Sequence, residues 1–302
     1  MPTVNLVPRQ LITSLITRFP KLPYFVILSR LNKPIGIYLL LWPTLWALWI
    51  ASAGSPGWHL LFVFVGGTIL TRSAGCIVND IVDRNFDGQV ERTNDRPLVN
   101  GQLTVLEAFV FLFILMFCAL LLVLSTNLLT LGIAFFGACV AAIYPFMKRF
   151  TYLPQVVLGI AFSCGIPMAF AAVQGEIPQV AWLLVTANLV WTVAYDTEYA
   201  MVDRRDDLRL GLKSSAILFA EMDKFAIGTL QAVFLGTLLL TAMSELFTWP
   251  FYIGLSVATS LIIYQQYLIR DRWRDECFGA FLNNHWVGLS IFLGLVGHYL
   301  IS

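Results

Sequence analysis

The chain alternates between long apolar runs and short polar segments, and this alternation predicts its elements. A helix that crosses the hydrocarbon core of a bilayer needs about 17–25 mostly apolar residues. Pro250 interrupts the eighth of the runs that meet this requirement, and the last run is the shortest. The nine predicted spans lie near residues 35–53, 59–78, 105–125, 128–146, 154–173, 179–197, 225–243, 246–267 and 285–301. The pattern therefore predicts an all-α integral membrane protein.

The predicted spans form one transmembrane domain, residues 25–302, which follows an N-terminal segment of residues 1–24. In that segment, residues 11–19 have apolar side chains at helical spacing, so we expect them to lie along the membrane surface. No continuous apolar run with a small-residue cleavage site follows Arg9 and Arg18, so no cleaved signal peptide is predicted.

The positions of the basic residues predict the orientation of the chain. Every Lys and Arg except Arg72 lies before the first span or in the loops after the second, fourth, sixth and eighth spans. Because cytoplasmic loops carry an excess of Lys and Arg, these segments are predicted to be cytoplasmic. With nine spans, the C-terminus is then outside. Arg72 lies inside the second span.

Composition strengthens this interpretation and excludes several classes of protein. Hydrophobic residues make up 58% of the chain and charged residues 12%, whereas soluble domains average about 25% charged residues. The net charge of +1 indicates no attraction to nucleic acid. Five cysteines without a CxxC pair and three isolated histidines indicate neither a disulfide framework nor a zinc site.

Two acidic segments stand out against this apolar background. The sequence "NDIVDRNFD" (79–87) follows the second span, and "DTEYAMVDRRDD" (196–207) follows the sixth. These are the same places in two successive groups of four spans, which predicts two parallel four-helix pseudo-repeats and a ninth helix around a central cavity. Both segments are on the predicted cytoplasmic side.

Helical spacing places the acids of each segment on one face. At about 100° per residue, Asp80, Asp83 and Asp87 fall within one narrow sector of a continued helix. Asp196, Asp203 and Asp207 do the same, with Tyr199 beside them. Two such carboxylate stripes facing one cavity would repel each other, so a cation is required between them. Oxygen ligands select a hard ion, and Mg²⁺ held by carboxylates usually also binds substrate phosphates. The simpler alternative is that both segments are solvated helix ends, balanced by nearby arginines.

Basic residues supply candidate contacts for the phosphates. Tyr144 and Lys148 are one helical turn apart at the predicted cytoplasmic end of the fourth span. An intramembrane charge such as Arg72 is a functional hypothesis by default, although a structural ion pair with Asp80 is the alternative. Arg30, before the first span, is a candidate for either membrane anchoring or substrate contact.

These motifs resemble those of the UbiA superfamily of intramembrane aromatic prenyltransferases. "AGCIVNDIVDRNFD" fits the pattern NDxxDxxxD of its first motif, and "YDTEYAMVDRRDD" looks like its second. The segments "RLNKPIG", "LLWPTLWAL", "RPLVNG", "YPFMKRFTYLPQ" and "GLKSSAILF" resemble the branch that acts on 4-hydroxybenzoate. The resemblance covers roughly residues 25–300. Asn32 departs from it, because many relatives carry Asp there.

The resemblance implies an activity and a set of site residues. It implies transfer of a polyprenyl group from its diphosphate to the ring carbon ortho to the hydroxyl of 4-hydroxybenzoate, in ubiquinone synthesis, at a bacterial inner membrane. It also implies a cavity that opens laterally to lipid. By this resemblance, Mg²⁺ and diphosphate would be held by Asn79, Asp83, Asp203 and Asp207, with Asp80, Asp87 and Asp196 in support. Tyr144 and Lys148 would contact the diphosphate, with help from Arg30, and Arg72 and Arg149 are candidates for the acceptor carboxylate.

Three other functions stay open from the sequence. A prenyltransferase for a different aromatic acceptor is the nearest. A phosphotransferase acting on CDP-activated lipids also uses acidic motifs, but "DGQVER" (87–92) lacks the continuation that its compact motif requires. A cation-coupled transporter would need ionisable groups near mid-membrane, where only Arg72 is found. Oligomeric state, protein partners and prenyl chain length are not predicted.

Overall fold

The computed structural model describes residues 18–88 and 93–302, with the side chains of residues 85–87 outside the description. Within these residues all regular structure is helical and no strand occurs. The predicted surface helix at 11–19 lies almost entirely outside the described residues.

The described residues contain seven helical segments that are long and apolar enough to cross a membrane. They are Trp58–Arg84, Val105–Leu124, Leu128–Met147, Pro154–Gln174, Ser215–Ser244, Trp249–Asp271 and Arg274–Ile301. Helix α3 (Ile35–Ala51) is apolar but shorter, with 17 residues. Helix α9 (Gln179–Leu210) has 32 residues and carries the second acidic motif. An all-helical membrane protein is confirmed, whereas the predicted number of nine spans stays a prediction.

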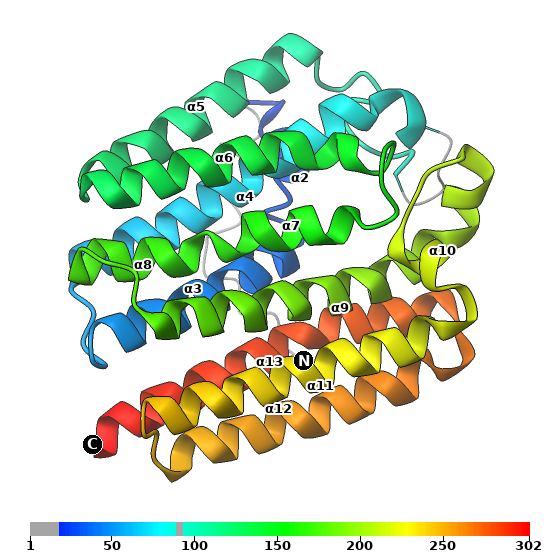
Figure 1. Ribbon diagram of the computed structural model, residues 1–302. Helices are drawn as coiled ribbons and strands as arrows, with labels where there is room; N and C mark the ends of the chain where they lie inside the picture. The colour runs from blue at the N-terminus through cyan, green and yellow to red at the C-terminus, as the bar shows by residue number, and fades with distance from the viewer. Residues whose placement is uncertain (1–17, 89–92) are drawn as a thin grey trace.

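Figure 1 shows the long helices as one bundle of roughly parallel rods. Helix α2 (Leu22–Leu28) is a short addition before the first of them. The others are α4 (Trp58–Asp87), α5 (Val105–Leu124), α6 (Leu128–Met147), α7 (Pro154–Ser163), α8 (Gly165–Gln174), α10 (Ser215–Phe219), α11 (Asp223–Ser244), α12 (Trp249–Leu268) and α13 (Arg274–Ile301). Each long helix overlaps a predicted span, α7 and α8 share one, and the short helices α2 and α10 correspond to none.

Local sequence signals explain where several helices begin. Thr104 and Glu107 form a reciprocal capping box at the start of α5. Asn127 accepts a hydrogen bond from the backbone N–H of Thr130 and caps α6. Pro250 does not interrupt the eighth predicted span, because it lies in the first turn of α12, where its missing N–H costs nothing.

An aromatic stack at the centre joins helices from both halves of the chain. Trp46 of α3 stacks on Trp191 of α9 with ring centroids 5.5 Å apart, and Trp191 stacks on Phe234 of α11 at 5.3 Å. All three side chains are fully buried. The Trp46 indole N–H also donates to the carbonyl of Gly288 in α13 at 3.1 Å. This core holds α9 in place between α3 and the α11–α13 group.

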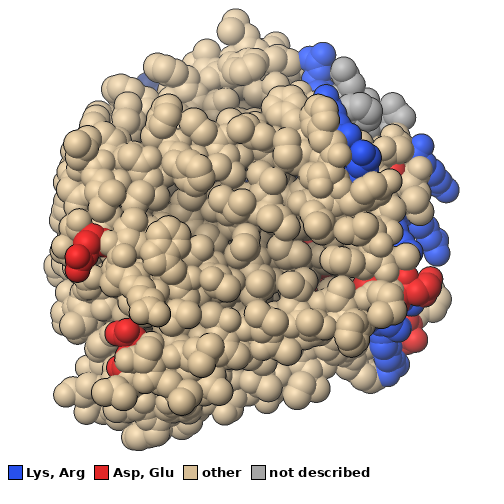
Figure 2. All heavy atoms as spheres, viewed as in Figure 1, with Lys and Arg blue, Asp and Glu red and all other residues tan. Residues whose placement is uncertain are grey.

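Charged side chains are unevenly distributed over this bundle. Figure 2 shows Lys and Arg gathered along the right-hand edge of the molecule, with a broad uncharged band across the middle. In the same view, α10 and the loop between α9 and α11 lie at that edge. Both acidic motifs are therefore at the basic end of the bundle, where α4 and α9 finish.

Candidate active site

The acidic motifs lie on continuous helices, as their spacing predicted. Helix α4 continues to Asp87 and α9 continues to Leu210, where Gly211 ends it in the left-handed conformation with φ of 68°. A non-glycine residue would be strained there. Because neither helix stops where the apolar run ends, the acids project from rigid helices rather than from loops.

Asp80 is buried between two arginines. Arg30 Nη2 donates to its two carboxylate oxygens at 2.9 and 3.0 Å, and Arg96 Nη1 lies 2.9 Å from Oδ1. Arg72 forms no ion pair with Asp80 in the described residues, so the predicted alternative of a structural pair between them is not observed. Arg30 itself has φ of 59°, a conformation that costs a non-glycine residue about 1 kcal/mol or more. Nη1 of Arg30 donates to the carbonyl of Ile27 at 2.8 Å, so both terminal nitrogens of this side chain are engaged.

Asp83 is only partly satisfied. Lys148 Nζ bonds to its Oδ2 atom. The other oxygen, Oδ1, is buried and has no hydrogen-bond partner among the described residues. A buried carboxylate oxygen without a partner is costly. The atom is therefore a natural ligand position for a cation or a donor that is absent from the protein itself.

The second motif is held from the side of α13. Arg274 Nη2 lies 2.8 Å from Asp206 Oδ2 and 3.7 Å from Asp203 Oδ1. Asp203 and Asp207 both have further interactions. Asp196, deeper in α9, lies within electrostatic range of Arg72 and Asp203.

Arg72, Asn79 and Tyr144 line one chamber of about 620 Å³. Its remaining walls, from α3 to α8, are mostly apolar. Arg72 is held by a cation–π contact, with its guanidinium carbon 5.4 Å from the Phe162 ring centroid. Its Nε is buried and has no hydrogen-bond partner among the described residues. Gly36 makes room for it, because a Cβ there would lie 2.4 Å from Nε. The chamber thus has an apolar body and a polar end with an unused donor.

Tyr144 of α6 lies near charged and phenolic side chains of both acidic helices. It lies within electrostatic range of Asp83 on α4, of Asp196 and Tyr199 on α9, and of Arg72. However, the described residues contain no group of three Asp, Glu, His or Cys side chains close enough to hold a metal ion on their own. The side chain of Asp87 lies outside the description, so its prediction is untested. The structure thus brings the Asp83–Lys148 pair, Tyr144, Arg72 and Asp196 into one region without forming a complete metal cage.

Arg149 lies away from this chamber. Its side chain is at the surface, where Nη2 donates to the carbonyl of Val82 at 3.4 Å and the guanidinium lies 5.7 Å from the Phe146 ring. Of the two candidates for an acceptor carboxylate, only Arg72 lines the chamber.

Sequence reasoning missed two groups of residues near the site. Arg96 pairs with Asp80 although 16 positions separate them, and only its place in a predicted cytoplasmic loop hinted at a role. Asp223 is fully buried and accepts from Arg272 at 2.8–3.1 Å and from Arg204 at 3.4 Å. The hydrogen bond to Asp223 raises the pKa of Arg272 above its usual value. This ion-pair cluster fixes the loop between α9 and α11 against the end of α12.

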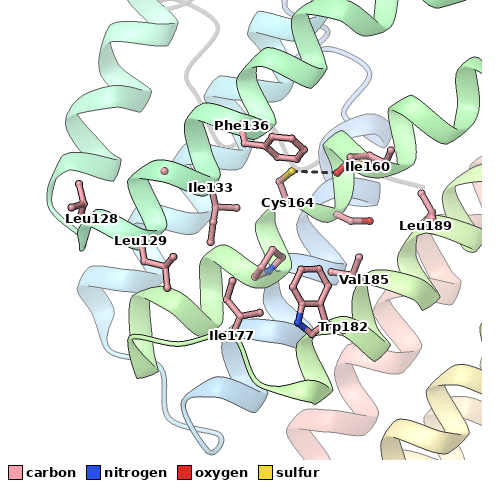
Figure 3. A pocket seen from close by; sticks show the side chains of 13 residues that line it. Leu128, Leu129, Ile133, Phe136, Ile160, Cys164, Ile177, Trp182, Val185 and Leu189 are labelled. Carbon is pink, nitrogen blue, oxygen red and sulfur yellow. Dashed lines mark hydrogen bonds between the residues drawn. The ribbon is translucent and has the colours of Figure 1, made fainter.

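A second cavity, of about 690 Å³, lies on the other side of α6. Figure 3 shows Ile133, Phe136, Trp182 and other apolar side chains of α6–α9 around it. The Cys164 thiol lines both cavities and donates to the carbonyl of Ile160 at 3.3 Å. No charged side chain of the described residues lines this second cavity, so it offers nothing to a diphosphate or a carboxylate.

Known proteins resemble this chain over most of its length. The model of the UbiA prenyltransferase family matches residues 40–289. Proteins named 4-hydroxybenzoate octaprenyltransferase from Hahella chejuensis and Tolumonas auensis are 54% and 56% identical to the chain; the alignments cover 93% and 91% of this chain, and 93% and 96% of the relatives.

Solved structures share the fold at lower identity. An apo UbiA homolog from Aeropyrum pernix K1 aligns with a TM-score of 0.75 at 21% identity over 87% of this chain and 96% of that one. A homolog from Archaeoglobus fulgidus, bound to GPP and Mg²⁺, aligns with a TM-score of 0.69 at 16% identity over 92% of this chain and all of that one. Because the family model covers residues 40–289 and the two octaprenyltransferases are more than half identical over nearly the whole chain, the chain belongs to the UbiA prenyltransferase family.

Proposed function

We propose that the protein transfers a polyprenyl group from polyprenyl diphosphate to the ring carbon ortho to the hydroxyl of 4-hydroxybenzoate, releasing diphosphate, in ubiquinone biosynthesis. The names of relatives that are more than half identical over nearly the whole chain support this activity. The observation that carries it is the chamber whose apolar body ends at Arg72 and Asn79 of the first acidic helix, α4, and at Tyr144 of α6.

The donor lies with its chain in the apolar chamber and its diphosphate at the polar end. Lys148 and Tyr144 contact the diphosphate, and Arg30 adds positive charge from the Asp80 side. Cationic and phenolic donors suit phosphate oxygens. The apolar walls exclude water, which would otherwise intercept a carbocation.

A bound Mg²⁺ fits the donor set of this region. All the candidate ligands present oxygen, and the unpaired Oδ1 of Asp83 offers a free position. The ion would be held by Asn79, Asp83, Asp203 and Asp207, with Asp80, Asp87 and Asp196 in support. The chemistry supplied by bound Mg²⁺ is neutralisation of the charge that grows on the diphosphate as the allylic C–O bond breaks.

Arg72 orients the acceptor through its carboxylate. Its buried, unpaired Nε donor and its position on the chamber wall favour it over Arg149. After the allylic carbon bonds to the ring, the ring carbon loses its proton to Asp196 or to the departing diphosphate, and the ring becomes aromatic again. The electrostatic interaction between Asp196 and Arg72 supports a role for Asp196 on the acceptor side.

The proposal also includes the number of membrane spans and the orientation of the chain in the membrane. The chain has nine spans in two four-helix pseudo-repeats plus a ninth helix, forming a single domain from residue 25. The basic end carries the site and is cytoplasmic, together with the N-terminus, and the C-terminus is outside a bacterial inner membrane. The gathering of Lys and Arg at one end of the bundle supports this orientation.

Transfer of a radiolabelled prenyl group in isolated membranes tests the function. We expect label to move from the prenyl diphosphate to 4-hydroxybenzoate and to stop when EDTA is added. Label transfer only to homogentisate or a naphthoate would indicate a different acceptor. Label in a phospholipid, or cation uptake without transfer, would instead support the phosphotransferase or the transporter.

A further inference from the structure

A second cluster of buried polar side chains lies behind the acidic face of α9. At its centre is Glu198, which is fully buried although it belongs to the second motif segment. The side chains around it come from four helices: Trp191 of α9, Gln231 of α11, Gln265 and Gln266 of α12, and Asn283 and Asn284 of α13. None of them lines the chamber.

Each carboxylate oxygen of Glu198 accepts a hydrogen bond from a neutral amide. Gln231 Nε2 donates to Oε1 at 3.2 Å, and Asn284 Nδ2 donates to Oε2 at 2.9 Å. Both neighbours present N–H groups, so this position requires an acceptor at both oxygens, which is what a carboxylate offers and an amide does not. An ionisable side chain inside a membrane bundle is costly, which makes a purely incidental Glu198 a poor explanation.

The two amides that bind Glu198 also bond to further side chains, so the orientation of Glu198 fixes theirs. Because Asn284 turns its Nδ2 toward Glu198, its Oδ1 accepts from the Trp191 indole N–H at 2.8 Å. Trp191 in turn packs edge-on against Tyr195, with ring centroids 5.3 Å apart. Gln231 Nε2 also donates to Gln265 Oε1 at 2.8 Å. The network therefore ties one face of α9 to three other helices.

That face is opposite the acidic one. At about 100° per residue, Glu198 lies about 200°, 140° and 180° around the helix from Asp196, Asp203 and Asp207. Because all four belong to the unbroken helix α9, any rotation that relieves a mismatch at Glu198 also turns the three acids by the same angle.

We propose that Glu198 is a positioning residue: through the buried amide network it sets the rotation of α9, and thereby aims the second acidic motif at the diphosphate. This inference rests on the proposed function, because it assigns a task to that same motif. Glu198 acts through the hydrogen bonds that its two oxygens accept, and it does not contact the substrate.

A swap of two side chains tests the proposal. In Glu198→Gln, one amide N–H must face a donor of Gln231 or Asn284. In Asn284→Asp, two carboxylates face each other. In the double variant Glu198→Gln/Asn284→Asp, the introduced amide accepts from Gln231 through its oxygen and donates through its nitrogen to the introduced carboxylate. That carboxylate still accepts from Trp191 through its second oxygen. The donor and acceptor pairing among Gln231, positions 198 and 284, and Trp191 is thus restored, with the charge moved from α9 to α13, and the donation of Asn284 Nδ2 to the carbonyl of Ala280 is lost.

Two readouts are measured on detergent-purified protein: transfer kinetics, and binding of geranyl thiodiphosphate as a function of Mg²⁺ concentration. We expect each single variant to lower kcat about tenfold and to raise the Mg²⁺ concentration needed for half-maximal binding, and the double variant to recover both within about threefold. Thr241→Val, buried on α11 and bonded only within its own helix, is the matched control and should leave both unchanged.

Single variants with wild-type kcat and Mg²⁺ dependence would overturn the proposal, as would a double variant no better than the singles. If Glu198→Gln does not accumulate, Asn284→Ala, which removes one donor, should show a milder defect in the same direction. The binding readout needs no acceptor. Failure of the proposed function would therefore show as wild-type protein that binds the thiodiphosphate without prenylating 4-hydroxybenzoate.

Discussion

Asp80 and Asp83 are neighbours on one face of α4, yet their surroundings give them different tasks. Asp80 is enclosed by Arg30 and Arg96, so both of its oxygens are already occupied. Asp83 has one oxygen bonded to Lys148 and one that has no partner among the residues that the structure describes. We interpret Asp80 as the residue that orders the arginines, and Asp83 as the residue that meets the ligand. Spacing alone could not separate these roles, because both acids fit the same motif equally well.

Replacing Asp83 should therefore remove catalysis without unfolding the protein. We expect Asp83→Asn to lower kcat by about 10²-fold or more, because a neutral amide oxygen holds Mg²⁺ more weakly than a carboxylate and supplies no negative charge to it. Prenyl transfer by the purified variant measures this. Asp206→Asn, which removes an acid paired with Arg274 outside the motif pattern, should keep most of the activity. Near-normal transfer by Asp83→Asn would contradict the assigned role.

Replacing Arg72 should weaken the binding of 4-hydroxybenzoate and leave the binding of the prenyl diphosphate unchanged. Loss of a charge-assisted hydrogen bond costs about 1.5–3 kcal/mol, so Arg72→Gln should raise the KM for 4-hydroxybenzoate about 10- to 100-fold. The KM for the prenyl diphosphate should change little. Arg149→Gln, at the surface, is the control and should change neither constant. An equal rise in both constants would place Arg72 on the diphosphate instead.

At the scale of the elements, hydrophobic periodicity predicted the positions of the helices well and their first and last residues poorly. Runs of apolar residues placed the helices within a few residues, but α13 begins at Arg274, eleven positions before the predicted start. Asn283 and Asn284 had marked that stretch as polar, whereas both are hydrogen-bonded in the buried network around Glu198. Such partners lie on other helices, so a local pattern cannot reveal them. The break between α7 and α8 at Cys164 was likewise absent from the pattern.

The close contact between α12 and α13 depends on Gly254, which has no side chain. A Cβ at Gly254 would lie 2.5 Å from the carbonyl oxygen of Ser290, so Gly254→Ala should force the two helices apart and cost about 1–3 kcal/mol. Gly236→Ala on α11 meets nothing within 4 Å and should be neutral or stabilising by up to about 1 kcal/mol. Thermal midpoints in detergent compare the two. Equal midpoints would show that the close approach is not required.

At the scale of the whole molecule, the uncharged band and the basic end describe how the bundle sits in a bilayer (Figure 2). The alternation of loops with and without Lys or Arg predicted the same end for every cationic loop. The pairing of Asp80 with Arg30 and Arg96, by contrast, needed the fold, because 50 and 16 positions separate these residues in the chain.

Orientation can be measured directly by labelling single introduced cysteines in a variant without the five native ones. A cysteine in place of Ser302 should react with a membrane-impermeant maleimide added outside intact cells. A cysteine in place of Lys213 should react only after the membrane is opened, because its loop lies at the basic end, which we propose is cytoplasmic. The reverse pattern would invert the topology.

The central claim is that both acidic helices hold one diphosphate together with Mg²⁺. Binding of geranyl thiodiphosphate to wild-type, Asp83→Asn and Asp203→Asn protein, with and without Mg²⁺, tests it most directly. We predict tight binding by the wild type only with Mg²⁺, and loss of that Mg²⁺-dependent part in either variant. Wild-type, Mg²⁺-dependent binding by Asp203→Asn would show that the second helix takes no part, and the account would be wrong.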